Sequence, residues 1–380
     1  MRIERIEIRV TDLKTRLQRQ RSTGAYDTGA PGALLGKPVL VTIFAEGILG
    51  RGQIRPLSPH HAMPDTYATM ISMVKEVCGP SLIGQRIFDV ESIHALFDRL
   101  APANNMARAA LDAALYDAMG KAMNQPVYNL IGGLAQPRIP LEWSISMASD
   151  PRKMVDDAER AVHEFGIRVL CIKAGHPSGW RQDAKHFRLI RETVGEDVTI
   201  GMDPNTGWSV AEALQALNAL KEHRVDYLEQ PVKRQDLTGM AAIRRAATGV
   251  PLMADEACQS IHDAHAIIAA EAADVLCIKL YKHRGYHAGA QDCGHCRSRQ
   301  HQDQFRWPRG AVSARGGSQR ALLRQPTGGA RHARRRIHLR SWRHRARSIS
   351  RGQRFCREER ACRSAERSRP RHHDRRESAR

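Results

Sequence analysis

Residues 169–175 read Val-Leu-Cys-Ile-Lys-Ala-Gly, a short apolar run that ends in a charged side chain followed by small residues. Comparable apolar runs recur from residue 139 onward, at 139–145, 168–174, 198–203, 226–229, 251–255 and 275–280. Amphipathic segments separate them, at 152–165, 183–194, 210–222, 237–247 and 261–270. Apolar strands that alternate with helices of this length indicate parallel βα units. Six units are visible, whereas a closed barrel of this kind has eight.

The N-terminal part of the chain follows another pattern. Alternating apolar residues predict a strand at 1–10, and further strands are expected at 38–45 and 50–54. Helical spacing of apolar residues follows at 65–77, 89–100 and 105–123. Gly132 and Gly133 end this region. We therefore predict an α+β domain over 1–133 and barrel units over 134–283.

The remaining residues, 284–380, have a different composition. The chain carries 60 Lys and Arg against 40 Asp and Glu, a net charge of +20, and all of this excess lies after residue 283. That segment holds 27 Arg and no Lys, and only six Val, Leu or Ile. So few large aliphatic residues cannot build a sizeable core. We predict a disordered, arginine-rich tail over 284–380.

Five of the predicted strands end in a charged residue. The carboxyl ends of parallel barrel strands meet at one mouth, where such enzymes place their catalytic groups. Three carboxylates from neighbouring strands form a hard oxygen site that suits Mg²⁺. A lysine on either side of them is a candidate general base. In chain order, the residues are Lys173, Asp203, Glu229, Asp255 and Lys279.

This arrangement suits the removal of a proton next to a carboxylate. Such a carbon is a weak acid, because deprotonation adds a second negative charge, and a metal on the carboxylate stabilises the resulting enediolate. One lysine would remove the proton, and the other would return it on the opposite face or assist a leaving group. A single charged residue at a strand end is usually solvated or salt-bridged, but five in succession favour a functional site.

These residues lie in motifs that resemble those of the mandelate racemase/muconate lactonizing enzyme family of the enolase superfamily. Residues 109–121 (AALDAALYDAMGK) and 130–133 (LIGG) resemble the junction between that family's two domains. The segments 172–175 (IKAG), 202–205 (MDPN), 228–231 (LEQP), 254–256 (ADE) and 278–280 (IKL) resemble, in order, its first base, its three metal-ligand motifs and its second base. The resemblance covers roughly residues 1–283.

The resemblance implies an α/β fold in which an α+β capping domain precedes a modified (β/α)7β TIM-type barrel, here incomplete after the sixth strand. It implies Mg²⁺ as cofactor, Lys173 and Lys279 as acid and base, a small carboxylate substrate and a homo-oligomer. It also selects Asp255 rather than the adjacent Glu256 as the third metal ligand. Glu256 is then a candidate for holding the metal ligands in position.

The sequence departs from the family in two places. The family commonly has Lys-X-Lys on the second barrel strand, where this chain has Cys171-Ile172-Lys173, which favours a specialised subgroup. We interpret Cys171 as a packing residue beside the site. The family also continues through two more barrel strands, whereas here the pattern vanishes near His283 and Arg284. The sudden replacement of lysine by arginine suggests that the tail is a frameshift product.

Four further residues are candidates for supporting the site or contacting substrate. Asn205 follows the first metal-ligand motif, and Trp143 lies on the first barrel strand, where core packing is an equal expectation. Tyr26 and Arg55 lie in segments that match the family's two substrate-closing loops, although a surface-loop role is at least as well supported.

Several classes of protein are disfavoured. No run approaches the roughly 20 apolar residues of a membrane span, and the N-terminus lacks the apolar core of a secretion signal. The wide cysteine spacing in 1–283 does not resemble a disulfide framework, so we expect a cytoplasmic protein. The arginine-rich tail would bind polyanions at low salt, but it offers no stacking platform for a selected nucleic-acid partner.

We therefore predict a Mg²⁺-dependent enzyme that abstracts a proton α to a carboxylate and dehydrates, racemises or epimerises a small hydroxy or amino acid. One alternative is a cycloisomerase. The other is a non-catalytic relic whose basic tail binds polyanions.

The frameshift hypothesis predicts that another reading frame of the coding DNA, beginning between the codons for Lys279 and Gly289, restores apolar strand–helix units with lysines and acids. Sequencing the DNA across these codons and translating all three frames tests it. If no frame continues the barrel pattern, the arginine-rich tail is a genuine segment.

Overall fold

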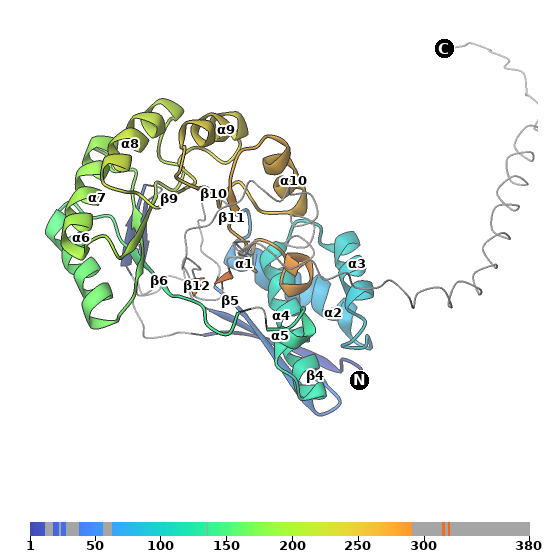
Figure 1. The fold of residues 1–380 in the computed structure, drawn as a ribbon. Coiled ribbons are helices and arrows are strands. Elements are labelled where there is room, and N and C mark those ends of the chain that lie inside the picture. Colours follow the sequence, from blue (N-terminus) through green and yellow to red (C-terminus); the bar gives the residue numbers. More distant parts are fainter. Residues whose placement is uncertain are drawn as a thin grey trace, which may run out of the picture. The chain divides into compact units, whose positions relative to one another are not determined.

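A computed structural model of the protein describes residues 1–11, 18–22, 24–27, 38–55, 63–134 and 136–290, with the short pairs 314–315 and 318–319 (Figure 1). Within these ranges, none of the helices combines the length and apolarity that a membrane span requires.

The N-terminal part forms an antiparallel sheet packed with helices, as predicted. The sheet has the order β1-β4-β5, and β2 and β3 form a separate antiparallel pair. The strands are β1 (Arg5–Val10), β2 (Gln18–Arg21), β3 (Gly24–Asp27), β4 (Val39–Ala45) and β5 (Ile48–Ile54). The helices are α1 (Tyr67–Ser72), the π-helical turn η1 (Met73–Cys78), α2 (Gly79–Leu82), α3 (Val90–Leu100), α4 (Asn105–Met123) and α5 (Val127–Leu130).

Helix α4 is the centre of this capping domain. It is buried on nearly every side, and its many alanines let it lie close to β5. A β-carbon on Gly50 or Gly52 would overlap the backbone of α4 at Ala114 or Ala110. The two glycines therefore permit the close contact of strand and helix.

The second part confirms the prediction of six parallel βα units. Its sheet has the order β11-β10-β9-β8-β7-β6, with every neighbouring pair parallel. The helices follow one another along the outside of the strands (Figure 1). The strands are β6 (Glu142–Ile145), β7 (Val169–Lys173), β8 (Thr199–Asp203), β9 (Tyr227–Glu229), β10 (Leu252–Ala254) and β11 (Val275–Leu276). The helices are α6 (Pro151–Glu159) with the π-helical turn η2 (Arg160–Glu164), α7 (Trp180–Val194), α8 (Val210–Glu222), α9 (Leu237–Ala246) and α10 (Ile261–Ala269). The pairs 314–315 and 318–319 form a short antiparallel ladder, β12 (Ala314–Arg315) and β13 (Ser318–Gln319).

Side chains alternate across the parallel sheet. On β7, Leu170 and Ile172 pack into the large core between strands and helices. Cys171 instead joins a small cluster with Tyr227, Met253 and Cys277. Since successive residues of a strand face opposite sides, Lys173 shares the inner face with Cys171. The alternation thus directs the charged strand ends toward one another.

The packed chain continues past the boundary predicted at residue 283. Tyr286 donates its backbone N–H to Asp112 of α4, and its ring lies 5.5 Å from that of Tyr116. Arg284 forms an ion pair with Asp98 at 3.1 Å. Residues 284–290 therefore pack on the capping domain instead of beginning a separate tail. Most of the predicted tail, apart from β12 and β13, lies outside the described residues.

The packing inside the barrel predicts a sensitive glycine. A β-carbon on Gly201 would overlap the ring of Tyr227, whereas one on Gly289 would meet its nearest atoms at 3.9 Å. We expect Gly201→Ala to lower the free energy of unfolding by about 1–3 kcal/mol through overpacking, and Gly289→Ala to change it by less than about 0.5 kcal/mol. Urea denaturation of both variants measures this, and equal effects would contradict the packing argument.

Candidate active site

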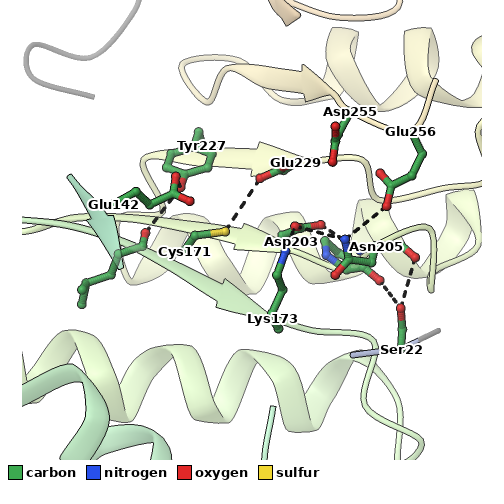
Figure 2. Close-up of polar contacts among 12 residues, drawn as sticks. Ser22, Glu142, Cys171, Lys173, Asp203, Asn205, Tyr227, Glu229, Asp255 and Glu256 are labelled. Atoms are coloured by element: carbon green, nitrogen blue, oxygen red, sulfur yellow. Dashed lines mark hydrogen bonds and ion pairs between the residues drawn. The ribbon is translucent and has the colours of Figure 1, made fainter. Parts of the chain in front are cut away.

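The structure gathers the five charged residues singled out from the sequence at the carboxyl end of the parallel strands. All five are buried, and Asp203 and Glu229 are completely inaccessible. Oxygen atoms of Asp203 and Glu229 lie within 4.8 Å of each other, and so do those of Glu229 and Asp255. Figure 2 shows Glu229 between the other two carboxylates. Glu229 is therefore the centre of the carboxylate cluster.

The two predicted lysines hold the outer carboxylates. The ladder between β7 and β8 sets Lys173 directly opposite Asp203, and the two side chains form an ion pair. Lys279 forms an ion pair with Asp255. The strand predicted over 275–280 is shorter in the structure, because β11 ends at Leu276. Lys279 thus lies in the segment that follows β11, where the chain turns toward the capping domain.

A third lysine, Lys282, also contacts the cluster, and the sequence analysis did not single it out. Its Nζ donates to Asp255 Oδ1 at 2.6 Å and to the Asp255 carbonyl at 2.7 Å. The capping domain fixes this lysine, since Asn105 Nδ2 donates to the Lys282 carbonyl at 2.7 Å. The spacing of Lys279 and Lys282, one helical turn apart, is the signal that could have revealed it.

Ion pairing sets the protonation states of Asp255 and its two lysine partners. Burial acts to raise the pKa of Asp255, but Lys279 and Lys282 hold it well below its usual value. Burial acts to lower the pKa of both lysines, yet Asp255 raises that of Lys279 well above its ordinary value and also raises that of Lys282. At neutral pH, Asp255 is therefore ionised and Lys279 is protonated.

Asn205 forms hydrogen bonds with both Asp203 and Glu256. Its backbone N–H and side-chain amide donate to Asp203, at 2.9 and 3.2 Å, and the amide also donates to Glu256 Oε1 at 3.2 Å (Figure 2). Ser22 of the capping domain donates to the carbonyls of Pro204 and Asn205, at 2.6 and 3.1 Å. Both domains thus fix the orientation of Asp203.

The other predicted candidates lie apart from these contacts. Trp143 stacks on Phe165, with ring centroids 5.4 Å apart, and packs against the core of strands and helices, so the structure shows it as a packing residue. Arg55 directly follows β5 and is half-buried. Tyr26 lies opposite Arg19 in the β2–β3 ladder, and its side chain is outside the described part.

Two buried polar side chains that the sequence analysis did not single out shape the loops around the site. Gln230 accepts from the backbone N–H groups of Asp255 and Ala257, both at 3.0 Å. Asp183 accepts from the N–H groups of Gly175 and His176 and from the Trp208 indole, at distances between 3.0 and 3.2 Å. Burial raises the pKa of Asp183, although these N–H donors act to lower it. Asp183 thereby joins the loops that follow Lys173 and Asp203.

The donor set fits a hard divalent cation. Three buried carboxylates converge, and two of them are already balanced by lysine charges, which a cation can replace as the counter-charge. The same cluster also approaches two thiols, because Cys171 lies within 4.8 Å of Asp203 and Glu229, and Cys277 within 4.8 Å of Glu229 and Asp255.

Comparisons with known proteins agree with this fold. Residues 35–132 match the N-terminal domain of the mandelate racemase/muconate lactonizing enzyme family, and residues 153–302 match the enolase C-terminal domain-like family. The chain belongs to the mandelate racemase/muconate lactonizing enzyme family of the enolase superfamily. The second match runs past residue 290, which agrees with the packing of residues 284–290.

The curated relatives are isomerases. The chain is 37% identical to an N-succinyl-L-Arg/Lys racemase of Bacillus cereus over 238 residues, 62% of this chain and 63% of that protein. It is 30% identical to a hydrophobic dipeptide epimerase of Enterococcus faecalis over 288 residues, 76% of this chain and 77% of that protein. The match thus spans somewhat less than two thirds of the racemase and about three quarters of the epimerase.

A solved structure resembles this fold over most of the chain. The structure of a dipeptide epimerase from Enterococcus faecalis, complexed with Mg and the dipeptide L-Leu-L-Tyr, superposes with a TM-score of 0.72 at 29% identity. The superposition covers 78% of this chain and 80% of that one.

The contacts of Asp183 predict a stability effect. Asp183→Asn replaces an oxygen acceptor with an amide that cannot accept from all three donors, so we expect the free energy of unfolding to fall by about 1–3 kcal/mol. The exposed control Asp197→Asn should change it by less than about 0.5 kcal/mol. Urea denaturation compares the two, and an equally small effect of both substitutions would contradict the anchoring role.

Proposed function

We propose that this protein is a Mg²⁺-dependent racemase or epimerase that exchanges the α-proton of a small carboxylate, with Lys173 and Lys279 as the two proton-transfer groups. The observation that carries the proposal is the pairing of these lysines with the outer members of one buried carboxylate cluster. A substrate carbon above Glu229 would then have a lysine on each side.

The lysines would divide the proton transfer between them. One in its neutral form removes the α-proton, and the other in its protonated form delivers a proton to the opposite face, which inverts the stereocentre. In the reverse direction the two groups exchange these tasks.

Asp203, Glu229 and Asp255 would hold the Mg²⁺. A bound divalent cation supplies the positive charge that stabilises a deprotonated carboxylate substrate and lowers the pKa of nearby lysines. Asn205 and Lys282 keep the outer two carboxylates in place.

The substrate class follows from the relatives more than from the described residues. The racemase acts on N-succinyl-L-Arg/Lys, and the epimerase acts on hydrophobic dipeptides. Both substrates are N-acylated amino acids with a free carboxylate. We therefore favour an N-acylated amino acid or dipeptide over a hydroxy acid, and epimerisation over the dehydration that the sequence analysis held open.

Solvent deuterium exchange tests the proton-transfer roles of Lys173 and Lys279. We expect the wild-type chain with Mg²⁺ to exchange the α-proton of both enantiomers of its substrate. Lys173→Ala and Lys279→Ala should each abolish inversion but retain exchange of one enantiomer, opposite for the two variants, because each keeps one base. A library of N-acylated amino acids and dipeptides in D₂O, followed by proton NMR, measures this. Lys185→Ala is a control, since this lysine lies on helix α7, outside the carboxylate cluster.

Three outcomes would contradict the proposal. Exchange that survives the double substitution of Lys173 and Lys279 would exclude them as the bases. Exchange without added Mg²⁺, after treatment with a chelator, would exclude the metal. Turnover of muconate without exchange of any amino-acid derivative would establish a cycloisomerase instead.

A further inference from the structure

Two thiols lie beside the inner side of the carboxylate cluster. Cys171 and Cys277 are both completely buried, and neither is in a disulfide. The Cys171 thiol donates to Glu229 Oε2 at 3.8 Å (Figure 2). The Cys171 sulfur, one oxygen of Asp203 and one oxygen of Glu229 all lie within 4.8 Å of one another.

The separation of the Cys171 sulfur and the Glu229 oxygen is close to the ligand spacing around a small tetrahedral ion. Zn²⁺ binds sulfur at about 2.3 Å and carboxylate oxygen at about 2.0–2.2 Å, which places tetrahedral sulfur and oxygen ligands about 3.5–3.7 Å apart. The distance of 3.8 Å between Cys171 and Glu229 is close to this value. Mixed thiolate and carboxylate ligands favour Zn²⁺ or Co²⁺ over Mg²⁺, which prefers oxygen alone.

The local backbone directs Cys171 to this position. The ladder of β7 and β8 sets Cys171 opposite Gly201, two residues before the pair of Lys173 and Asp203. Since Gly201 has no side chain, Cys171 has no side-chain neighbour from that position of β8. The thiol therefore lies one layer below the ion pair, on the same inner face.

We propose that Cys171, Asp203 and Glu229 form a site for a thiophilic divalent cation, of which Zn²⁺ is the type, one layer deeper than the Mg²⁺ position. Binding forms one metal–sulfur bond and releases the thiol proton to solvent, with no change in oxidation state. Because the site shares Asp203 and Glu229 with the proposed Mg²⁺ site, an ion bound there excludes Mg²⁺ and withdraws both carboxylates from it.

Cys171 is a better ligand than Cys277 for two reasons. The Cys171 thiol contacts Glu229 at 3.8 Å, a distance close to that of a ligand pair. The group that contains Cys277 also needs Asp255, which Lys279 and Lys282 already hold with two ion pairs. An ion at Cys277 would compete with two lysines for Asp255, whereas an ion at Cys171 would compete with Lys173 alone for Asp203.

Cobalt titration of the full-length chain tests this inference without any turnover, so its outcome is independent of the proposed epimerase activity. A thiolate bound to Co²⁺ gives a strong near-ultraviolet charge-transfer band that oxygen ligands do not give. We expect the wild-type chain to show this band. Cys171→Ser should remove it and weaken Co²⁺ binding at least about tenfold, and Cys277→Ser should leave both unchanged.

The variants also distinguish loss of the metal site from loss of the folded structure. Cys171→Ser and Cys171→Ala should unfold at similar urea concentrations and both lack the band, while Glu229→Gln should lower Co²⁺ affinity. Absence of the band in the wild-type chain, or its loss in Cys277→Ser but not in Cys171→Ser, would overturn the proposal.

Discussion

The structure depends on the burial of three carboxylates at the ends of adjacent parallel strands. An isolated buried carboxylate is too costly to persist in ionised form, so each must have a compensating charge or hydrogen bond. Lys173 supplies the charge for Asp203, and Lys279 and Lys282 supply it for Asp255. Glu229, inaccessible and between the two, belongs to both candidate metal-ligand groups. The cluster is therefore held together by its charges and organised around Glu229.

The capping domain helps to position the buried carboxylates through residues that lie between it and the cluster. Asn105, at the start of α4, fixes the carbonyl of Lys282, and Lys282 in turn holds Asp255. Ser22 fixes the loop that carries Asn205, and Asn205 holds Asp203. Each outer carboxylate is thus connected through one intermediate residue to the N-terminal domain. Substitutions at these positions in either domain should accordingly alter the orientation of the outer carboxylates.

Much of this arrangement could be predicted from the sequence, because parallel βα units place the strand ends together whatever the details of packing. The spacing of about one unit between successive charged residues indicated the lysines and carboxylates, and the family resemblance decided between Asp255 and Glu256. Lys282, Asp183 and Gln230 could not be found in that way, since their contacts depend on how loops turn after the strands end. The boundary at residue 283 was inferred from composition alone, and composition does not reveal that Asp112 accepts the backbone N–H of Tyr286. Trp143 was equally ambiguous in sequence, because its strand has residues that face both inward and outward.

The central claim is that the buried carboxylates form one cation site organised by Glu229. Calorimetric titration of Mg²⁺ into the wild-type chain and into Glu229→Gln, a substitution that keeps the shape of the side chain and removes its charge, measures this directly. One Mg²⁺ per wild-type chain, with binding lost or weakened at least about tenfold in Glu229→Gln, is the expected result. Equal binding by both chains would show that Mg²⁺ binding does not depend on Glu229 and would contradict this claim.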